Sequence, residues 1–205
     1  MKIKLFISLF FISVIAISAC NNNPDSKAVQ SNQENSLDKT QQGLYLKKGK
    51  TIAAATFANL SGHLQQSLAE GGVPNALKYC NLAAIPLVDS LSQIHQASIR
   101  RTSRKVRNPK DKPTKLEKEV LINFANQAQN GKEPVPFVQR IDPKSIAFFA
   151  PIKINDFCLQ CHGKVGETLS DENYAIIKQF YPEDEAIGYV VGDLRGIWSI
   201  EFFEE

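Results

Sequence analysis

Small and apolar positions recur with a helical period after Pro74. The residues that share this face are Ala76, Leu77, Cys80, Ala83 and Ala84. Spacings of three and four residues are typical of one face of an α-helix. Proline is well suited to a first helical turn, where an amide proton is not needed. The pattern therefore predicts a helix that begins at Pro74 and points Cys80 inward.

A second helical pattern begins at Thr114. Thr114 and Glu117 have the spacing of a capping box, in which each side chain bonds to the other residue's backbone. The apolar positions that follow are Leu116, Val120, Leu121 and Phe124. An amphipathic helix is predicted from Thr114 to about Gly131.

Apolar residues are nearly continuous over residues 145–154, SIAFFAPIKI, which predicts a buried strand. Residues 186–203 predict two strands of a hairpin around Gly192–Asp193, with Tyr189 and Trp198 in the core. Helices come first and strands follow, with a helix between them. This order predicts an α+β domain with N-terminal helices and an antiparallel sheet.

The first nineteen residues have the pattern of an export signal. Lys2 and Lys4 precede an apolar run over residues 5–19, which is too short for a comfortable membrane span. The sequence Ile17-Ser-Ala-Cys20 resembles a bacterial lipobox, in which Cys20 is lipidated and becomes the N-terminus. Asn21 after this cysteine favours, by the same resemblance, the outer membrane on its periplasmic side. The alternative is cleavage to a soluble exported protein.

Residues 20–42 are rich in Asn, Gln and Ser and have almost no apolar side chains after Cys20. Such a composition cannot bury enough surface to offset its ordering entropy. We therefore predict a lipidated cysteine and a flexible tether over 20–42, with a reach of roughly 25 Å. The folded domain is predicted over 43–205.

The composition sets limits on size and on partners. A chain of 205 residues with 43% hydrophobic and 22% charged residues can form one sizeable core or two small ones. The formal charge is +3, and removal of Lys2 and Lys4 would leave +1. Nothing in this balance indicates a nucleic-acid partner.

The strongest chemical signal is Cys158-Leu-Gln-Cys161-His162. Two cysteines with this spacing, followed by histidine, are typical of covalent c-type haem attachment. Cys158 and Cys161 would form the thioethers, and His162 would bind the iron. The motif occurs once, so one haem is predicted. The alternatives are a zinc site completed by Cys80 and one histidine, and a redox-active cysteine pair in which His162 has no role.

The residue on the other face of the iron is less clear from spacing alone. Many small cytochromes use methionine, but the one methionine is Met1, within the signal. The candidates are Cys80, His63 and His95, or an open site. Cys80 could equally be a buried structural cysteine. His63 lies in a helical run, and His95 lies near the end of another.

Six cations lie within residues 101–113, RTSRKVRNPKDKP. They are Arg101, Arg104, Lys105, Arg107, Lys110 and Lys112. A solvated loop that turns at Asn108–Pro109 explains most of them. Arg101 and Arg107 are also predicted to bind the haem propionates, because a guanidinium donates two parallel bonds to a carboxylate. Arg195 is expected at the surface, with a haem propionate as the alternative partner.

Three segments together resemble a known family. They are residues 101–109, the CLQCHG segment at 158–163 and YPEDEAIGYVVGDLRGIWSIEF at 181–202. They are similar, from about Thr51 onward, to exported bacterial proteins that carry one covalent haem on a PAS-like domain. That family occurs alone and as the sensor part of histidine kinases and chemoreceptors. The resemblance implies a PAS-like fold and iron ligation by His162 and a distal cysteine, whose placement Cys80 matches.

Two functions follow from these expectations. The first is an extracytoplasmic sensor of redox state or of a small ligand such as a diatomic gas, signalling to an unknown protein partner. The second is a lipid-tethered electron carrier with an unknown redox partner. An enzyme would need an acid–base group near the iron, and the sequence places neither His63 nor His95 there. We therefore predict no enzymatic activity.

Overall fold

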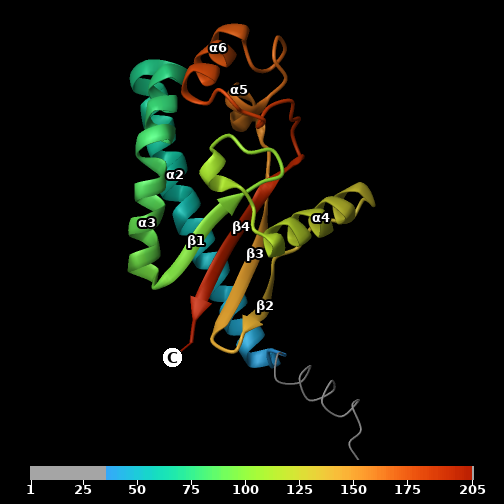
Figure 1. Cartoon of the computed structure of the whole chain (residues 1–205). Helices are drawn as coiled ribbons and strands as arrows, with labels where there is room; N and C mark the ends of the chain where they lie inside the picture. Colours follow the sequence, from blue (N-terminus) through green and yellow to red (C-terminus); the bar gives the residue numbers. More distant parts are fainter. Residues whose placement is uncertain (1–35, 205) are drawn as a thin grey trace, which may run out of the picture. The chain divides into compact units, whose positions relative to one another are not determined.

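The computed structural model describes residues 36–204, which form an α+β fold with a four-stranded antiparallel sheet (Figure 1). This confirms the predicted fold class, whereas the PAS-like assignment stays a prediction. The signal segment and Cys20 lie outside the described residues. No helix within residues 36–204 has both the length and the apolar character that crossing a membrane requires.

The first helix within residues 36–204, α2 (Lys39–Leu82), begins inside the segment predicted as tether. Asp38 and Gln41 form a reciprocal capping box at its start. Leu37, just before the cap, is buried. Residues 39–42 are thus helical, because a local cap and one apolar anchor outweigh a polar composition.

Helix α2 reverses direction at Gly71 and Gly72, where φ is −161° and +65°. The chain then runs back beside the first part of α2, with Pro74 in the first turn after the break (Figure 1). This confirms the predicted helix start at Pro74. Helix α3 (Ala84–His95) continues in the same direction after a cap at Ala83.

The sheet has the strand order β1-β4-β3-β2, and all neighbours are antiparallel. Its strands are β1 (Ala97–Thr102), β2 (Phe137–Asp142), β3 (Ser145–Lys153) and β4 (Leu194–Phe203). Strand β3 is the buried strand predicted from its apolar run.

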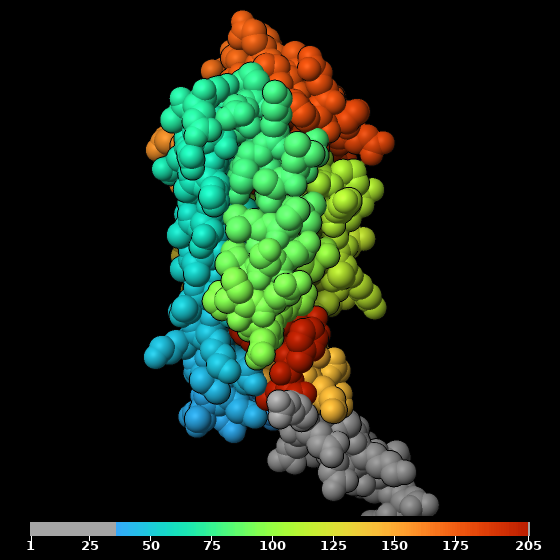
Figure 2. Space-filling view, turned by 90° about the vertical axis from the view of Figure 1, so that its left-hand side faces the viewer, coloured from blue at the N-terminus to red at the C-terminus, as the bar shows by residue number. Residues whose placement is uncertain are grey.

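Each face of the sheet supports one apolar cluster. Phe148 and Trp198 belong to the cluster with α2 and α3, whereas Phe149 and Ile197 belong to the cluster with α4 (Lys115–Gln129). Consecutive strand residues point to opposite faces, which explains the alternation. Figure 2 shows α2 and α3 covering the first of these faces. The capping box at the start of α4 is confirmed.

A third cluster lies beyond the end of the sheet, where α2 reverses. Val73 and Leu77 of α2 pack with Leu169, Tyr181 and Ile177, the last on α6 (Asp171–Phe180). The sequence did not indicate α6. This cluster joins the second part of α2 to the segment that follows the CLQCHG motif.

The predicted C-terminal hairpin is wrong in its first strand. Only β4 forms, and residues 187–193 contain no strand. The amide groups of Gly188 and Tyr189 instead donate to the carbonyl oxygens of Gly163 and His162. The segment is thus bonded to the CLQCHG loop rather than to β4. Tyr189 and Trp198 are buried, as predicted.

Candidate functional site

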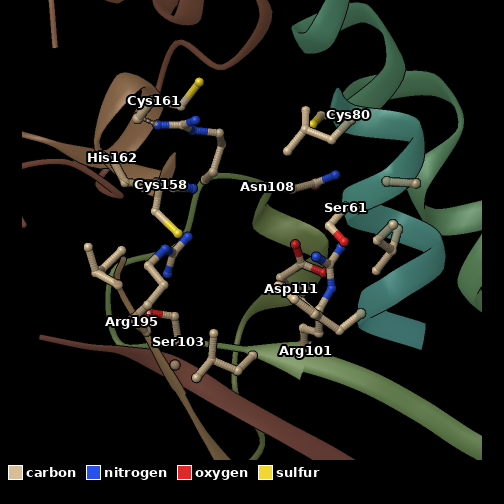
Figure 3. Close-up of a pocket in the computed structure, with 18 of the residues that line it drawn as sticks. Ser61, Cys80, Arg101, Ser103, Asn108, Asp111, Cys158, Cys161, His162 and Arg195 are labelled. Atoms are coloured by element: carbon tan, nitrogen blue, oxygen red, sulfur yellow. Dashed lines mark hydrogen bonds between the residues drawn. The ribbon is translucent and has the colours of Figure 1, made fainter. Parts of the chain in front are cut away.

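A cavity of about 280 Å³ lies at the end of the sheet where β3 ends and β4 begins. This is close to the lower end of the range typical of ligand pockets. Its wall is mostly apolar and comes from α2, from β1 and the loop after it, and from the CLQCHG segment. Figure 3 shows Cys158, Cys161 and His162 on one side and Cys80 on the other.

The two cysteines of the motif lie on short helical turns. Cys158 ends the 3-10 turn η2 (Asp156–Cys158), and Cys161 lies on α5 (Leu159–His162). The side chain of Asn155 accepts from the Cys158 amide group and, at 3.1 Å, from its thiol. Burial raises the pKa of the Cys161 thiol, and the nearby Arg107 cation opposes this in part. Both cysteines line the cavity and are free thiols.

The imidazole of His162 has a defined hydrogen-bond partner. Its Nδ1 lies 2.7 Å from the carbonyl oxygen of Ala186. A carbonyl can only accept, so Nδ1 carries the proton and Nε2 keeps a lone pair. Burial, followed by the charges of Arg195 and Arg107, holds the pKa of His162 well below its usual value. His162 is therefore a neutral ring with Nε2 available as a metal ligand.

Cys80 lines the same cavity from the second part of α2. Burial raises the pKa of its thiol, while the charges of Arg101 and Arg107 act in the opposite direction. The other two ligand candidates are placed elsewhere. His63 is exposed, His95 ends α3, and neither is among the described residues that line the cavity.

Two arginines reach the cavity from neighbouring strands. Arg101 of β1 lies over the ring of Trp198, with 5.8 Å from its guanidinium carbon to the ring centroid. Arg195 of β4 lines the cavity rather than lying at the surface as expected. Its Nε is buried without a hydrogen-bond partner among residues 36–204. The guanidinium of Arg195 lies over the ring of Tyr189, with 5.5 Å from its carbon to the ring centroid. Its Nη1 donates to the carbonyl oxygen of Lys105, which is distant in the chain, so no local pattern signals this placement.

Arg107 also lines the cavity, but much of its guanidinium is already bonded. Nε and Nη2 donate to the two carboxylate oxygens of Asp184 at 3.1 and 3.0 Å. Nη2 also donates to the carbonyl oxygen of Cys161 at 2.6 Å. Fewer donors remain for a propionate than the sequence suggested, and that predicted role stays untested.

Three further polar side chains in the cavity wall were missed by the sequence analysis. The Tyr79 hydroxyl is buried and has no partner within residues 36–204. Burial, with a smaller contribution from Cys80, raises the pKa of Tyr181 to about 12. Burial also raises the pKa of the Asp111 carboxyl, against the charges of Arg101 and Arg100.

The donor set of the cavity fits a haem. Two thiols two residues apart in a C-x-x-C-H motif line the cavity, an imidazole offers its Nε2, and a third thiol lies across the cavity. Arg195 Nε is a buried donor without a protein partner among residues 36–204, which fits a polar group of a ligand in the cavity. A zinc site fits less well, since no group of three His, Cys, Asp or Glu side chains placed for a metal occurs in the described part.

A comparison with family models identifies one family. The family model described as Tll0287-like matches residues 20–202. Among solved structures, the chain is similar to "Crystal structure of the cyanobacterial heme-protein Tll0287". The identity is 23% and the TM-score 0.49, over 75% of this chain and 96% of that chain. No curated protein matches. The family match spans every residue that lines the cavity.

Proposed function

The chain belongs to the Tll0287-like family, and we propose that it binds one haem, attached covalently through Cys158 and Cys161. The protein that gives the family its name is described as a heme-protein. In this chain each thiol would add across one vinyl group, forming a sulfur–carbon bond while its proton passes to the outer vinyl carbon. The addition is redox-neutral and needs no further reactant.

The axial ligands in this proposal are His162 and Cys80. The observation that carries it is the single cavity lined by both residues, which come from segments far apart in the chain. The Ala186 carbonyl holds His162 as the Nδ1–H tautomer, which directs Nε2 toward a metal. Bound haem would supply a centre for one-electron redox change, and a thiolate on the iron favours its oxidised form.

Cations near the cavity support the binding of the haem's two carboxylates. Arg101 lines the wall, and Arg195 has an unpartnered buried Nε. Guanidinium groups bind carboxylates through paired donors, so both side chains suit the propionates. Arg107 is the weaker candidate because Asp184 already holds it.

We further propose that the haem domain is an extracytoplasmic sensor of redox state or of a diatomic gas. Cys80 lies on a short helical segment bounded by the break at Gly71–Gly72 and by the cap at Ala83. A ligand on a segment with a break at each end can leave the iron without unfolding a long helix. Export and lipidation at Cys20 would hold the domain near a membrane, where it passes its signal to a protein partner.

Optical spectra of oxidised and reduced protein test this proposal. The protein would be made with the c-type maturation machinery as wild type, Cys80→Ala and the control His63→Gln. We expect covalent haem in all three by intact mass, and loss of the thiolate signature in Cys80→Ala alone. Identical spectra would make Cys80 a structural residue, and absence of covalent haem would overturn the whole assignment.

Carbon monoxide added to the reduced protein then separates the two roles. Binding by the wild type indicates that Cys80 leaves on reduction, as a sensor requires. Failure to bind, with reversible reduction, would instead favour the lipid-tethered electron carrier.

A further inference from the structure

Two of the segments that carry the family resemblance meet at one buried ion pair. Arg107 lies in the 101–109 segment, and Asp184 lies in the 181–202 segment. Their side chains are only 11% and 0% exposed. A backbone bond from Glu185 N to Val106 O, at 3.0 Å, joins the same two segments. The axial ligands proposed above do not explain why these two side chains are paired.

The pair is connected to His162 through one short turn. Asp184 Oδ1 accepts from the amide group of Ala186 at 2.9 Å. Oδ1 also accepts from Arg107 Nε, and Oδ2 accepts from Arg107 Nη2. The carbonyl of Ala186 is the acceptor for His162 Nδ1. Arg107 Nη2 also lies 3.4 Å from that carbonyl oxygen, at the long end for a hydrogen bond. Asp184 therefore fixes the turn whose carbonyl orients His162.

Arg107 also bonds to the main chain next to His162. Its Nη2 donates to the carbonyl oxygen of Cys161, the residue before His162. One guanidinium thus bonds both to the helical turn that carries the imidazole and to the carboxylate that places its acceptor. Since Arg107 and Asp184 come from different segments, neither contact follows from local folding.

Stability alone is a weak explanation for this pair. A buried ion pair loses hydration of both charges and often contributes no more than apolar side chains of similar size would. Its best-supported use is to select one arrangement of the groups around it. Here those groups are the main-chain atoms that surround a proposed iron ligand.

We propose that the Arg107–Asp184 pair is a positioning device for His162, which sets the orientation of the imidazole and the strength of its Nδ1–H bond, and thereby the reduction potential of the haem. This inference rests on the proposed function. Groups outside the first ligand sphere commonly tune a metal in this way, through the hydrogen bond of the ligating histidine.

Potentiometric titration of three variants tests the proposal. Asp184→Asn removes the charge that compensates Arg107, and the excess cation favours reduction. We expect the equilibrium constant for one-electron reduction to rise about tenfold, which is 59 mV. Arg107→Lys keeps the charge but loses the paired donors. The Ala186 carbonyl then accepts more strongly from His162, and the potential falls.

Glu204→Gln is the control, because it breaks another arginine–carboxylate pair, at the other end of the sheet and away from His162. We expect it to leave the potential unchanged. The proposal is overturned if Asp184→Asn and Arg107→Lys behave like Glu204→Gln, or if both move the potential in the same direction, as simple loosening of the site would.

A second measurement decides the matter even if the wild type carries no haem and the proposed function fails. Long-range ¹H–¹⁵N correlation spectra report the tautomer of each of the three histidines, assigned with His63→Gln and His95→Gln. We expect His162 to be the Nδ1–H tautomer in the wild type and a mixture in Asp184→Asn. An unchanged tautomer in a folded variant refutes the positioning role.

Discussion

The two ends of the sheet each carry an arginine–carboxylate pair, and the pairs have different surroundings. At the end away from the cavity, Arg140 bonds to Glu204 at 2.6 Å. The Tyr45 hydroxyl donates to the other carboxylate oxygen of Glu204 at 3.0 Å. These contacts join α2, β2 and the residue after β4. We call this region the closed end.

At the cavity end, the Arg107–Asp184 pair contacts main-chain groups that hold His162. The chemistry of the two pairs is alike, yet one joins structural elements and the other surrounds a candidate ligand. At the closed end Tyr45 packs against the apolar cluster that contains Phe202. The cavity end leaves the Tyr79 hydroxyl and Arg195 Nε unpartnered in the described part. What an ion pair does is therefore decided by the groups that share its donors and acceptors.

The largest effect is expected from Gly163→Ala at the cavity end. An added Cβ would lie 2.6 Å from the carbonyl oxygen of Leu159, and a backbone atom cannot move aside. The turn that carries His162 must shift. A misplacement of about 1 Å can cost about 100-fold in rate, so we expect covalent haem content, measured by intact mass, to fall by about tenfold or more. Unchanged haem content would show that this turn tolerates displacement.

Gly49→Ala is the matching substitution on the α2 face of the sheet. Helix α2 crosses the sheet so closely at Gly49 that an added Cβ would overlap the ring of Phe148. Overpacking of this kind costs about 1–3 kcal/mol, which urea denaturation would measure as a lower free energy of unfolding. We expect the haem spectrum of the folded protein to stay as in wild type. A spectral change would mean that the two ends are coupled.

The smallest effect is expected from Glu204→Gln at the closed end. The hydrogen bond from Arg140 lowers the pKa of Glu204 from its ordinary value of 4.5. The charged form is thus favoured in the folded state. Its stabilisation is present above pH 4.5 and is lost as the pH falls through the lowered pKa. Because the pair is partly solvated, we expect a loss of less than about 1 kcal/mol at neutral pH.

Urea denaturation of wild type and Glu204→Gln along a series of decreasing pH would check this. The difference between the two proteins should shrink toward acid. A difference that grows as the pH falls would contradict the claim that Arg140 stabilises the charged form of Glu204.

Features with a local cause were predictable from the sequence. The helix that begins after Thr114 depends on the capping box between Thr114 and Glu117. The strand at 145–153 depends on its own apolar run. The helix start at Pro74 was found for the same reason. The predicted hairpin failed because the amide groups of Gly188 and Tyr189 found acceptors in a distant loop, which no local pattern reveals.

The candidate site likewise has one part with a local cause and one part that depends on contacts between distant segments. The spacing of Cys158, Cys161 and His162 is a property of one short segment, so the sequence by itself determined the candidate haem motif. That Cys80 shares a cavity with it, and that Arg107 pairs with Asp184, was decided only by the tertiary structure. The physical reason is that these contacts join segments far apart in the chain, and they form only when the packing of α2, α6 and the sheet brings those segments together.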